Sequence, residues 1–187
     1  MGSQKDNLLV DVAIGLAAGF VATKVTEFAQ EALYRPMPES VKQAEEAVRP
    51  GPPPEVAARK TMQAIGHPLG QQKLKFATMA VHYGLGVGWG PLYGLLRRQS
   101  RMQPLGAGFV TGAAMSLIVD EALTPALGFS APSRAYPNIT HVRGLVAHLV
   151  YGAAAALAAE SLYRLLNVSP DSEAGRTELP SRGPNGA

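Results

Sequence analysis

The stretch LLVDVAIGLAAGFVATKVTEF (residues 8–28) decides the fold class of this chain. It is long enough for one membrane crossing, because the hydrocarbon core of a bilayer needs a helix of about 20 mostly apolar residues. Comparable apolar stretches occupy residues 76–96, 105–127 and 142–165. Each is too long for a buried strand, so the sequence predicts an all-α polytopic membrane protein with four transmembrane helices.

The composition of these stretches supports the same prediction. Charged residues make up only 17% of the 187-residue chain, and they collect in the tails and in one long loop. Glycine and alanine are abundant in the apolar stretches, where small residues let helix backbones approach each other in lipid. A soluble bundle would have to bury such helices on all sides, and this chain is too short to do so. The glycines expected to pack helices together are Gly15, Gly19, Gly84, Gly88, Gly108 and Gly112.

Several classes of function are excluded or disfavoured by what the sequence lacks. The absence of cysteine excludes a disulfide framework, a thiolate metal site and a cysteine nucleophile. No nucleophile and base stand at motif spacing and no phosphate loop is present, so we expect no enzyme activity, no cofactor and no metal. The net charge of +3 is modest, and basic residues are not interleaved with aromatic ones, which argues against nucleic-acid binding.

Short motifs recur in the same order in the two halves of the chain. Several matches in one order indicate duplication of a two-helix unit. Each unit holds two crossings, so we expect two parallel repeats related by an axis along the membrane normal. The matched segments are AGFV at 18–21 and 107–110, EAL at 31–33 and 121–123, His82 and His148, and Tyr93 and Tyr163 with the leucines that follow them.

The two halves differ in the segment between their crossings. In the first half, residues 29–75 form a long loop with two short helical patterns, at 39–48 and 55–65, separated by a proline-rich break. In the second half this loop is short. We expect residues 1–166 to form one transmembrane domain, and residues 167–187, rich in Ser, Pro and Gly, to form a disordered tail.

Lysine and arginine in short loops predict the orientation. The loop RRQSR (residues 97–101) carries three arginines, and Lys5 and Arg164 are expected on the same side. Lys73 and Lys75 favour the opposite orientation. The balance predicts that both termini and the arginine loop face the cytoplasm.

Ionisable side chains inside apolar helices are costly to bury and are therefore candidates for a functional site. A rise of about 1.5 Å per residue places several of them toward the outer ends of the predicted helices. Asp11, near the opposite end, is expected to reach water. The predicted polar intramembrane cluster consists of Glu27, Glu31, His82, Asp120, Glu121 and His148.

Three interpretations of this cluster remain open. Its side chains hold the helices together by hydrogen bonds, or they form a proton-responsive site, because histidine titrates near neutral pH. The third interpretation is a metal or haem site on facing helices, although no Glu-x-x-His pair is present. Lys24 and Glu27, three residues apart, are expected to pair within their own helix.

The helix motifs resemble those of the YagU-like family of small bacterial inner-membrane proteins. The resemblance lies in residues 15–23, the stretch from His82 to Gly94, residues 106–123, and the stretch from His148 to Tyr163. It implies a bacterial inner-membrane location and a role in survival under acid stress. It supplies no catalytic or binding residues.

The leading functional expectation is a non-enzymatic inner-membrane protein that contributes to envelope or acid-stress tolerance. The first alternative is a small transporter or channel subunit that uses the histidine and carboxylate cluster. The second is a haem- or metal-binding redox subunit. The expected partner is the lipid bilayer, with a homo-oligomer left open and nucleic acid not expected.

Overall fold

The computed structural model describes residues 2–100 and 102–168, so all but the first two residues of the predicted disordered tail lie outside the described part. The described residues form helices and no strand, in agreement with the predicted all-α class. The elements are α1 (Gly2–Tyr34), α2 (Glu39–Val48), α3 (Pro53–Ala64), α4 (Gln71–Gln99), α5 (Pro104–Met115), a π-helix (Ser116–Leu123), α6 (Thr124–Ala126), a 3-10 turn (Ser133–Ala135) and α7 (Asn138–Leu165).

Three segments are long and apolar enough to cross a membrane: Leu8–Tyr34, Pro104–Ala126 and Asn138–Leu165. They match the predicted crossings in α1, in the continuous rod of α5, π-helix and α6, and in α7. The other predicted crossing lies in α4, which is long enough but less apolar. Its many glycines add little hydrophobicity, and lysines and arginines stand near its ends.

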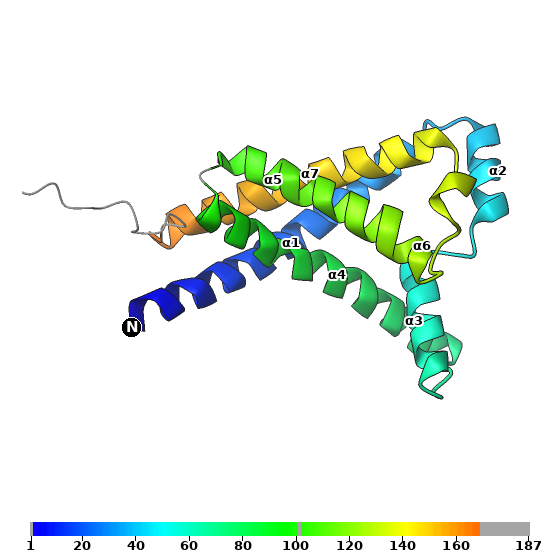
Figure 1. The fold of residues 1–187 in the computed structure, drawn as a ribbon, viewed down its shortest axis with the longest axis horizontal. Coiled ribbons are helices and arrows are strands. Elements are labelled where there is room, and N and C mark those ends of the chain that lie inside the picture. Colours follow the sequence, from blue (N-terminus) through cyan, green and yellow to red (C-terminus); the bar gives the residue numbers. More distant parts are fainter. Residues whose placement is uncertain (1, 101, 169–187) are drawn as a thin grey trace, which may run out of the picture.

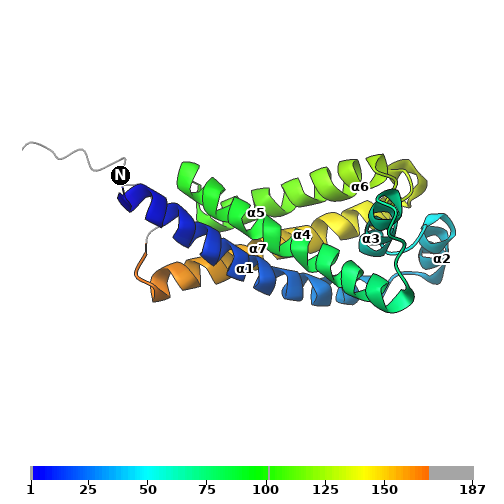
Figure 2. The ribbon, with the colours of Figure 1, turned by 90° about the horizontal axis from the view of Figure 1, so that it is seen from below.

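The long helices run side by side as an elongated bundle (Figure 1, Figure 2). Helix α1 packs against both α4 and α7, and α7 also packs against α5. Helices α1 and α7 therefore hold the centre, while α4 and the α5 rod flank them. The smaller contact between α4 and α5 leaves this side of the bundle more open.

Glycines bring the backbones of paired helices into contact. A Cβ atom added to Gly90 of α4 would lie 1.9 Å from the carbonyl oxygen of Gly15 in α1. In the second pair, a Cβ on Gly112 of α5 would lie 2.0 Å from the carbonyl oxygen of His148 in α7. Only the hydrogen of glycine fits at these positions. The backbones of the paired helices therefore come into direct contact, as is common where small residues pack helices together in lipid.

The structure corrects the expected glycine face of α4. Gly86 and Gly90 point at α1, whereas a Cβ on Gly84 or Gly88 would meet no atom within 4 Å. Both pairs of glycines have the same four-residue spacing, so the spacing alone does not tell which pair faces the neighbour. The other predicted packing glycines lie in helix contacts: Gly15, Gly19, Gly108 and Gly112.

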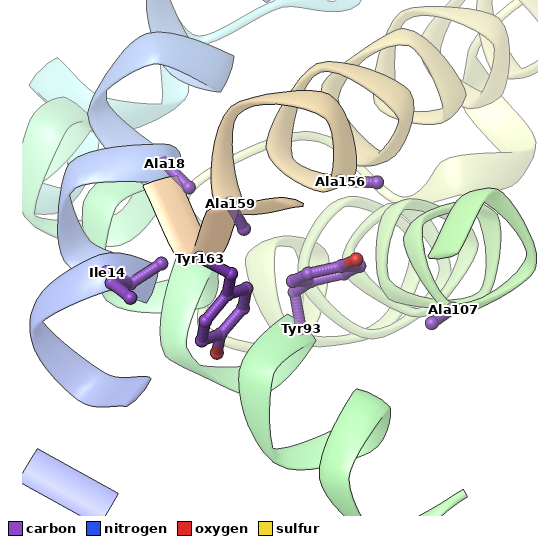
Figure 3. Packing of buried hydrophobic residues seen from close by; sticks show 7 residues of the cluster. All are labelled: Ile14, Ala18, Tyr93, Ala107, Ala156, Ala159 and Tyr163. Carbon is purple, nitrogen blue, oxygen red and sulfur yellow. The ribbon is translucent and has the colours of Figure 1, made fainter. Parts of the chain in front are cut away.

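A buried cluster joins all of the long helices near the end that carries the N-terminus. Figure 3 shows its residues, with Tyr93 of α4 and Tyr163 of α7 among much smaller side chains. Large apolar side chains lie instead on the outside, as Phe76 (68% exposed) and Leu157 (63% exposed) illustrate. This arrangement of a small-residue interior and an apolar exterior suits a lipid environment.

Helices α2 and α3 lie at the other end of the bundle, beside α6 and the start of α7 (Figure 1). They confirm the two helical patterns expected in the long loop. Lys60 of α3 donates a hydrogen bond to the carbonyl oxygen of Gly128 after α6 (2.7 Å), and α2 contacts α7 through buried Glu45. We call these two helices the cap.

The π-helix lies where the spacing of two sequence motifs differs. The spacing from AGFV to EAL is one residue longer in the second half than in the first. A π-helix has i→i+5 hydrogen bonds, so its turn holds one residue more than an α-helical turn. The segment Ser116–Leu123 begins after AGFV (107–110) and includes EAL (121–123), so it covers the place where the spacing is one residue longer.

Candidate functional site

Histidine and carboxylate side chains pair near the capped end of the bundle. In each pair the two side chains come from elements that are adjacent in space. A charged pair is formed whenever the histidine is protonated while the carboxylate is ionised. The pairs are Glu27 with His82 (3.1 Å), Asp120 with His148 (3.3 Å) and Glu121 with His141 (2.6 Å).

The first pair joins α1 to α4. One carboxylate oxygen of Glu27 accepts a hydrogen bond from the Tyr83 hydroxyl (2.8 Å) and contacts Nε2 of His82. The other oxygen accepts one from Nζ of Lys24 (2.6 Å), which confirms the expected pairing within the helix. Lys24 also donates to the Tyr83 hydroxyl (2.9 Å). These four polar side chains thus form hydrogen bonds with one another on the partly exposed side of the α1–α4 pair.

The second pair joins the π-helix to α7. His148 is 6% exposed, and its Nδ1 lies 2.9 Å from the carbonyl oxygen of Gly144 and 3.3 Å from a carboxylate oxygen of Asp120. Both neighbours are acceptors, so this nitrogen carries the proton. His148 also packs its backbone against Gly112, so the pair is part of the α5–α7 contact.

The third pair includes a histidine that the sequence did not single out. His141 Nδ1 contacts Glu121, and its Nε2 lies 3.0 Å from the carbonyl oxygen of Ser133. The Ser133 hydroxyl donates in turn to the backbone carbonyl of Glu121 (3.1 Å). With an oxygen acceptor at each ring nitrogen, His141 satisfies both acceptors when it is doubly protonated. Its position just before the predicted crossing, and not inside it, is why the sequence missed it.

The predicted cluster is thus arranged as separate pairs. Glu31 pairs with Arg35 on the exposed surface (2.9 Å) and contacts neither histidine. In the part of the chain that the structure describes, no hydrogen bond links the Glu27–His82 pair to the Asp120–His148 pair. Over the same residues, no group of three or more His, Asp or Glu side chains is arranged to hold a metal ion.

A second polar network lies near the opposite end, and the sequence did not predict it. Asp11 is only 1% exposed, and it accepts hydrogen bonds from Nε of Arg98 (2.5 Å) and from the Tyr163 hydroxyl (3.1 Å). The expectation that Asp11 reaches water is therefore wrong, because α4 and α7 cover it. Beside it, Glu160 accepts from Tyr93 (2.8 Å) and Arg97 (3.1 Å).

Glu45 fastens the cap to the bundle. Its carboxylate accepts hydrogen bonds from Thr140 (2.6 Å) and Arg143 (2.9 Å) at the start of α7. The Arg143 guanidinium also lies over the ring of Tyr34, 5.0 Å from its centre. Burial by itself raises the pKa of the Glu45 carboxyl, but the hydrogen bonds from Arg143 and Thr140 outweigh burial and hold the pKa below its usual 4.5.

Comparison of the chain with protein-family models, with curated proteins and with solved structures gave no match. Its class therefore follows from the fold and the surface alone. Three apolar helices of membrane-crossing length and an apolar exterior are the features of a helical membrane protein.

Proposed function

We propose that this chain is a non-enzymatic protein of the bacterial inner membrane that contributes to envelope tolerance of acid. The observation that carries the proposal is the set of three histidine–carboxylate pairs near one end of the bundle. The YagU-like resemblance of the helix motifs supports the same location and role. The proposed form is a four-crossing bundle made of two parallel two-helix repeats, with both termini in the cytoplasm.

The pairs provide a physical link between acidity and the bundle. Where the carboxylate of a pair is ionised, protonation of its histidine partner turns a hydrogen bond to a neutral ring into an ion pair, which is the stronger interaction. Mild acid is therefore expected to tighten the contacts of α1 with α4 and of the π-helix with α7.

The polar groups and the packing favour this role over transport. The ionisable pairs lie toward the two ends, and between them the helices touch through the backbones of Gly15 and Gly90 and of Gly108 and Gly152. Alanines, a few larger apolar side chains and the rings of Tyr93, Tyr151 and Tyr163 fill the remaining interior. A close-packed middle supports a structural or sensing role better than a polar pathway through one chain.

The test is acid survival of a strain that lacks the gene. We expect deletion to lower survival, and the unaltered gene to restore it. A triple variant, His82→Gln, His141→Gln and His148→Gln, should reach the same level in the membrane but fail to restore survival. Normal survival of the deletion strain would overturn the proposed role.

The matched control is His67→Gln. His67 is the remaining histidine of the chain, and it is exposed in the loop between α3 and α4, away from the pairs. This variant should restore survival fully. If His67→Gln also fails to restore survival, acid survival depends on the number of histidines and not on their pairing with carboxylates.

A further inference from the structure

A hollow lies beside the π-helix at the capped end of the bundle. Its volume is about 430 Å³, which is within the usual range of pockets that hold small ligands. The π-helix forms one wall, and the 3-10 turn and the start of α7 form the rest. The residues used below are Leu117, Glu121, Arg134, His141, Val142 and Leu145.

One side of the hollow is apolar and belongs to the lipid-facing surface. Leu117 is 60% exposed and Val142 is 54% exposed, and Leu145 continues this surface one turn further along α7. These side chains lie on segments long and apolar enough to cross a membrane. A hydrocarbon chain fits along them, because apolar side chains at membrane depth face lipid tails and not water.

The other side carries a cation with no partner. Arg134 is exposed, and the described structure gives it neither a hydrogen bond nor an ion pair. Its turn is fixed, because Ser133 is hydrogen-bonded to both Glu121 and His141. The carboxylate of Glu121 is already engaged by His141, so it does not neutralise Arg134.

We propose that this hollow binds one anionic phospholipid. The headgroup phosphate contacts Arg134, whose planar guanidinium suits phosphate oxygens, and one acyl chain lies along Leu117, Val142 and Leu145. We choose a lipid because the hollow combines two features. Its apolar wall continues the surface of segments long enough to cross a membrane, and the unpaired Arg134 lies at the end of that wall. The inference rests on the membrane location in the proposed function and is independent of the acid role.

The experiment measures lipid retention by the full chain purified in detergent, using native mass spectrometry. Phosphatidylglycerol and phosphatidylcholine with identical acyl chains are added separately at matched concentrations. We expect one phosphatidylglycerol to be retained about tenfold more strongly than phosphatidylcholine, because the choline cation of phosphatidylcholine offsets the charge of its phosphate beside Arg134. Arg134→Gln should reduce its retention to the phosphatidylcholine level.

Arg59→Gln is the control, because Arg59 lies in α3 at the same end of the bundle (Figure 1) and the substitution removes the same charge. It should retain phosphatidylglycerol as the unaltered chain does. Equal retention of the two lipids, or no effect of Arg134→Gln, would overturn the inference. So would displacement of the lipid by soluble glycerol phosphate, since the hollow would then recognise phosphate without the acyl chain.

Membrane fractionation of the same cells separates the two proposals. A chain that sediments with the membranes but shows no preference for phosphatidylglycerol contradicts only the lipid site. A chain that stays in the soluble fraction contradicts the membrane location itself, and the lipid site with it. Circular dichroism of Arg134→Gln confirms that the variant is folded before its lipid retention is compared.

Discussion

At the scale of single residues, the ion pairs of the bundle differ in how deeply they are buried. The side chains of Asp11 and Arg98 are 2% and 16% exposed, respectively. Those of Glu27 and His82 are 32% and 38% exposed. A partly exposed ion pair contributes less than about 1 kcal/mol, whereas removal of one partner of a buried pair leaves the other charge without compensation. Asp11 is therefore expected to contribute more to stability than Glu27.

We predict that Asp11→Ala lowers the free energy of unfolding by about 3 kcal/mol, because Arg98 is left buried and unpaired. Tyr163→Phe is the comparison, since it removes one hydrogen bond to the same carboxylate and should cost about 1 kcal/mol. Unfolding in mixed micelles with increasing dodecyl sulfate measures both. Equal losses for the two variants would show that Asp11 is not the centre of this network.

At the scale of helices, the contacts depend on which face of a helix turns toward its neighbour. The α1–α4 and α5–α7 pairs use glycine in the same way, with backbone oxygens where a Cβ would be. The outer face of α4 carries glycines with free space around them. Substituting alanine for glycine on the two faces therefore separates two effects on stability. On a contact face the new methyl group disturbs helix packing, and on the outer face it changes only helix propensity.

Gly112→Ala is predicted to destabilise the bundle by about 2 kcal/mol, because the new methyl group would overlap the carbonyl oxygen of His148 and force α5 and α7 apart. Gly88→Ala meets no atom within 4 Å, so it should be neutral or stabilise by up to about 1 kcal/mol. Thermal melting in one detergent compares them. A similar loss in both variants would mean that Gly88 also faces a neighbour.

The cap should respond to acid through Glu45. Because the folded pKa of this carboxyl is lowered, the ionised form stabilises docking of α2 above pH 4.5, and this stabilisation is lost as pH falls through the lowered pKa. A spin label at position 43 (Gln43→Cys) in this cysteine-free chain reports the motion of α2. We expect it to stay immobile from neutral pH to about 4.5 and to gain mobility below.

Glu45→Ala should mobilise the label already at neutral pH. Glu46→Ala is the matched control, since Glu46 is exposed and, among the described residues, forms its ion pair with Arg49 just after α2. It should leave the label immobile at neutral pH. An immobile label in the Glu45→Ala variant would mean that other contacts hold the cap.

At the scale of the whole molecule, the number of crossings depends on α4. It runs beside α1, and its exposed side carries Phe76 and Met79. Lysines near its start and arginines near its end would flank a crossing, as expected at the two interfaces. If α4 crosses, the cap and the turn between α4 and α5 lie on opposite sides of the membrane.

We predict that single cysteines at positions 43 and 99 (Gln43→Cys, Gln99→Cys) react from opposite sides with a membrane-impermeant maleimide. In spheroplasts the cysteine at position 43 should react and the one at position 99 should not, and in inverted vesicles the result should reverse. Reaction of both cysteines from one side would contradict a crossing by α4. Reversed labelling in both preparations would keep four crossings but invert the proposed orientation.

The sequence by itself determined the features that depend on neighbours along the chain. The all-α class and three helices long and apolar enough to cross a membrane follow from apolar length, because a helix satisfies its own backbone hydrogen bonds in lipid. The cap helices and the Lys24–Glu27 pair follow from local spacing as well.

Only the tertiary structure decided which residues meet across helices. It paired His141 with Glu121, buried Asp11 beneath Arg98, and turned Gly86 and not Gly84 toward α1. Each of these outcomes depends on the rotation of a helix about its axis. That rotation is set by contacts between residues far apart in sequence, since almost any face of these small and apolar helices is compatible with lipid.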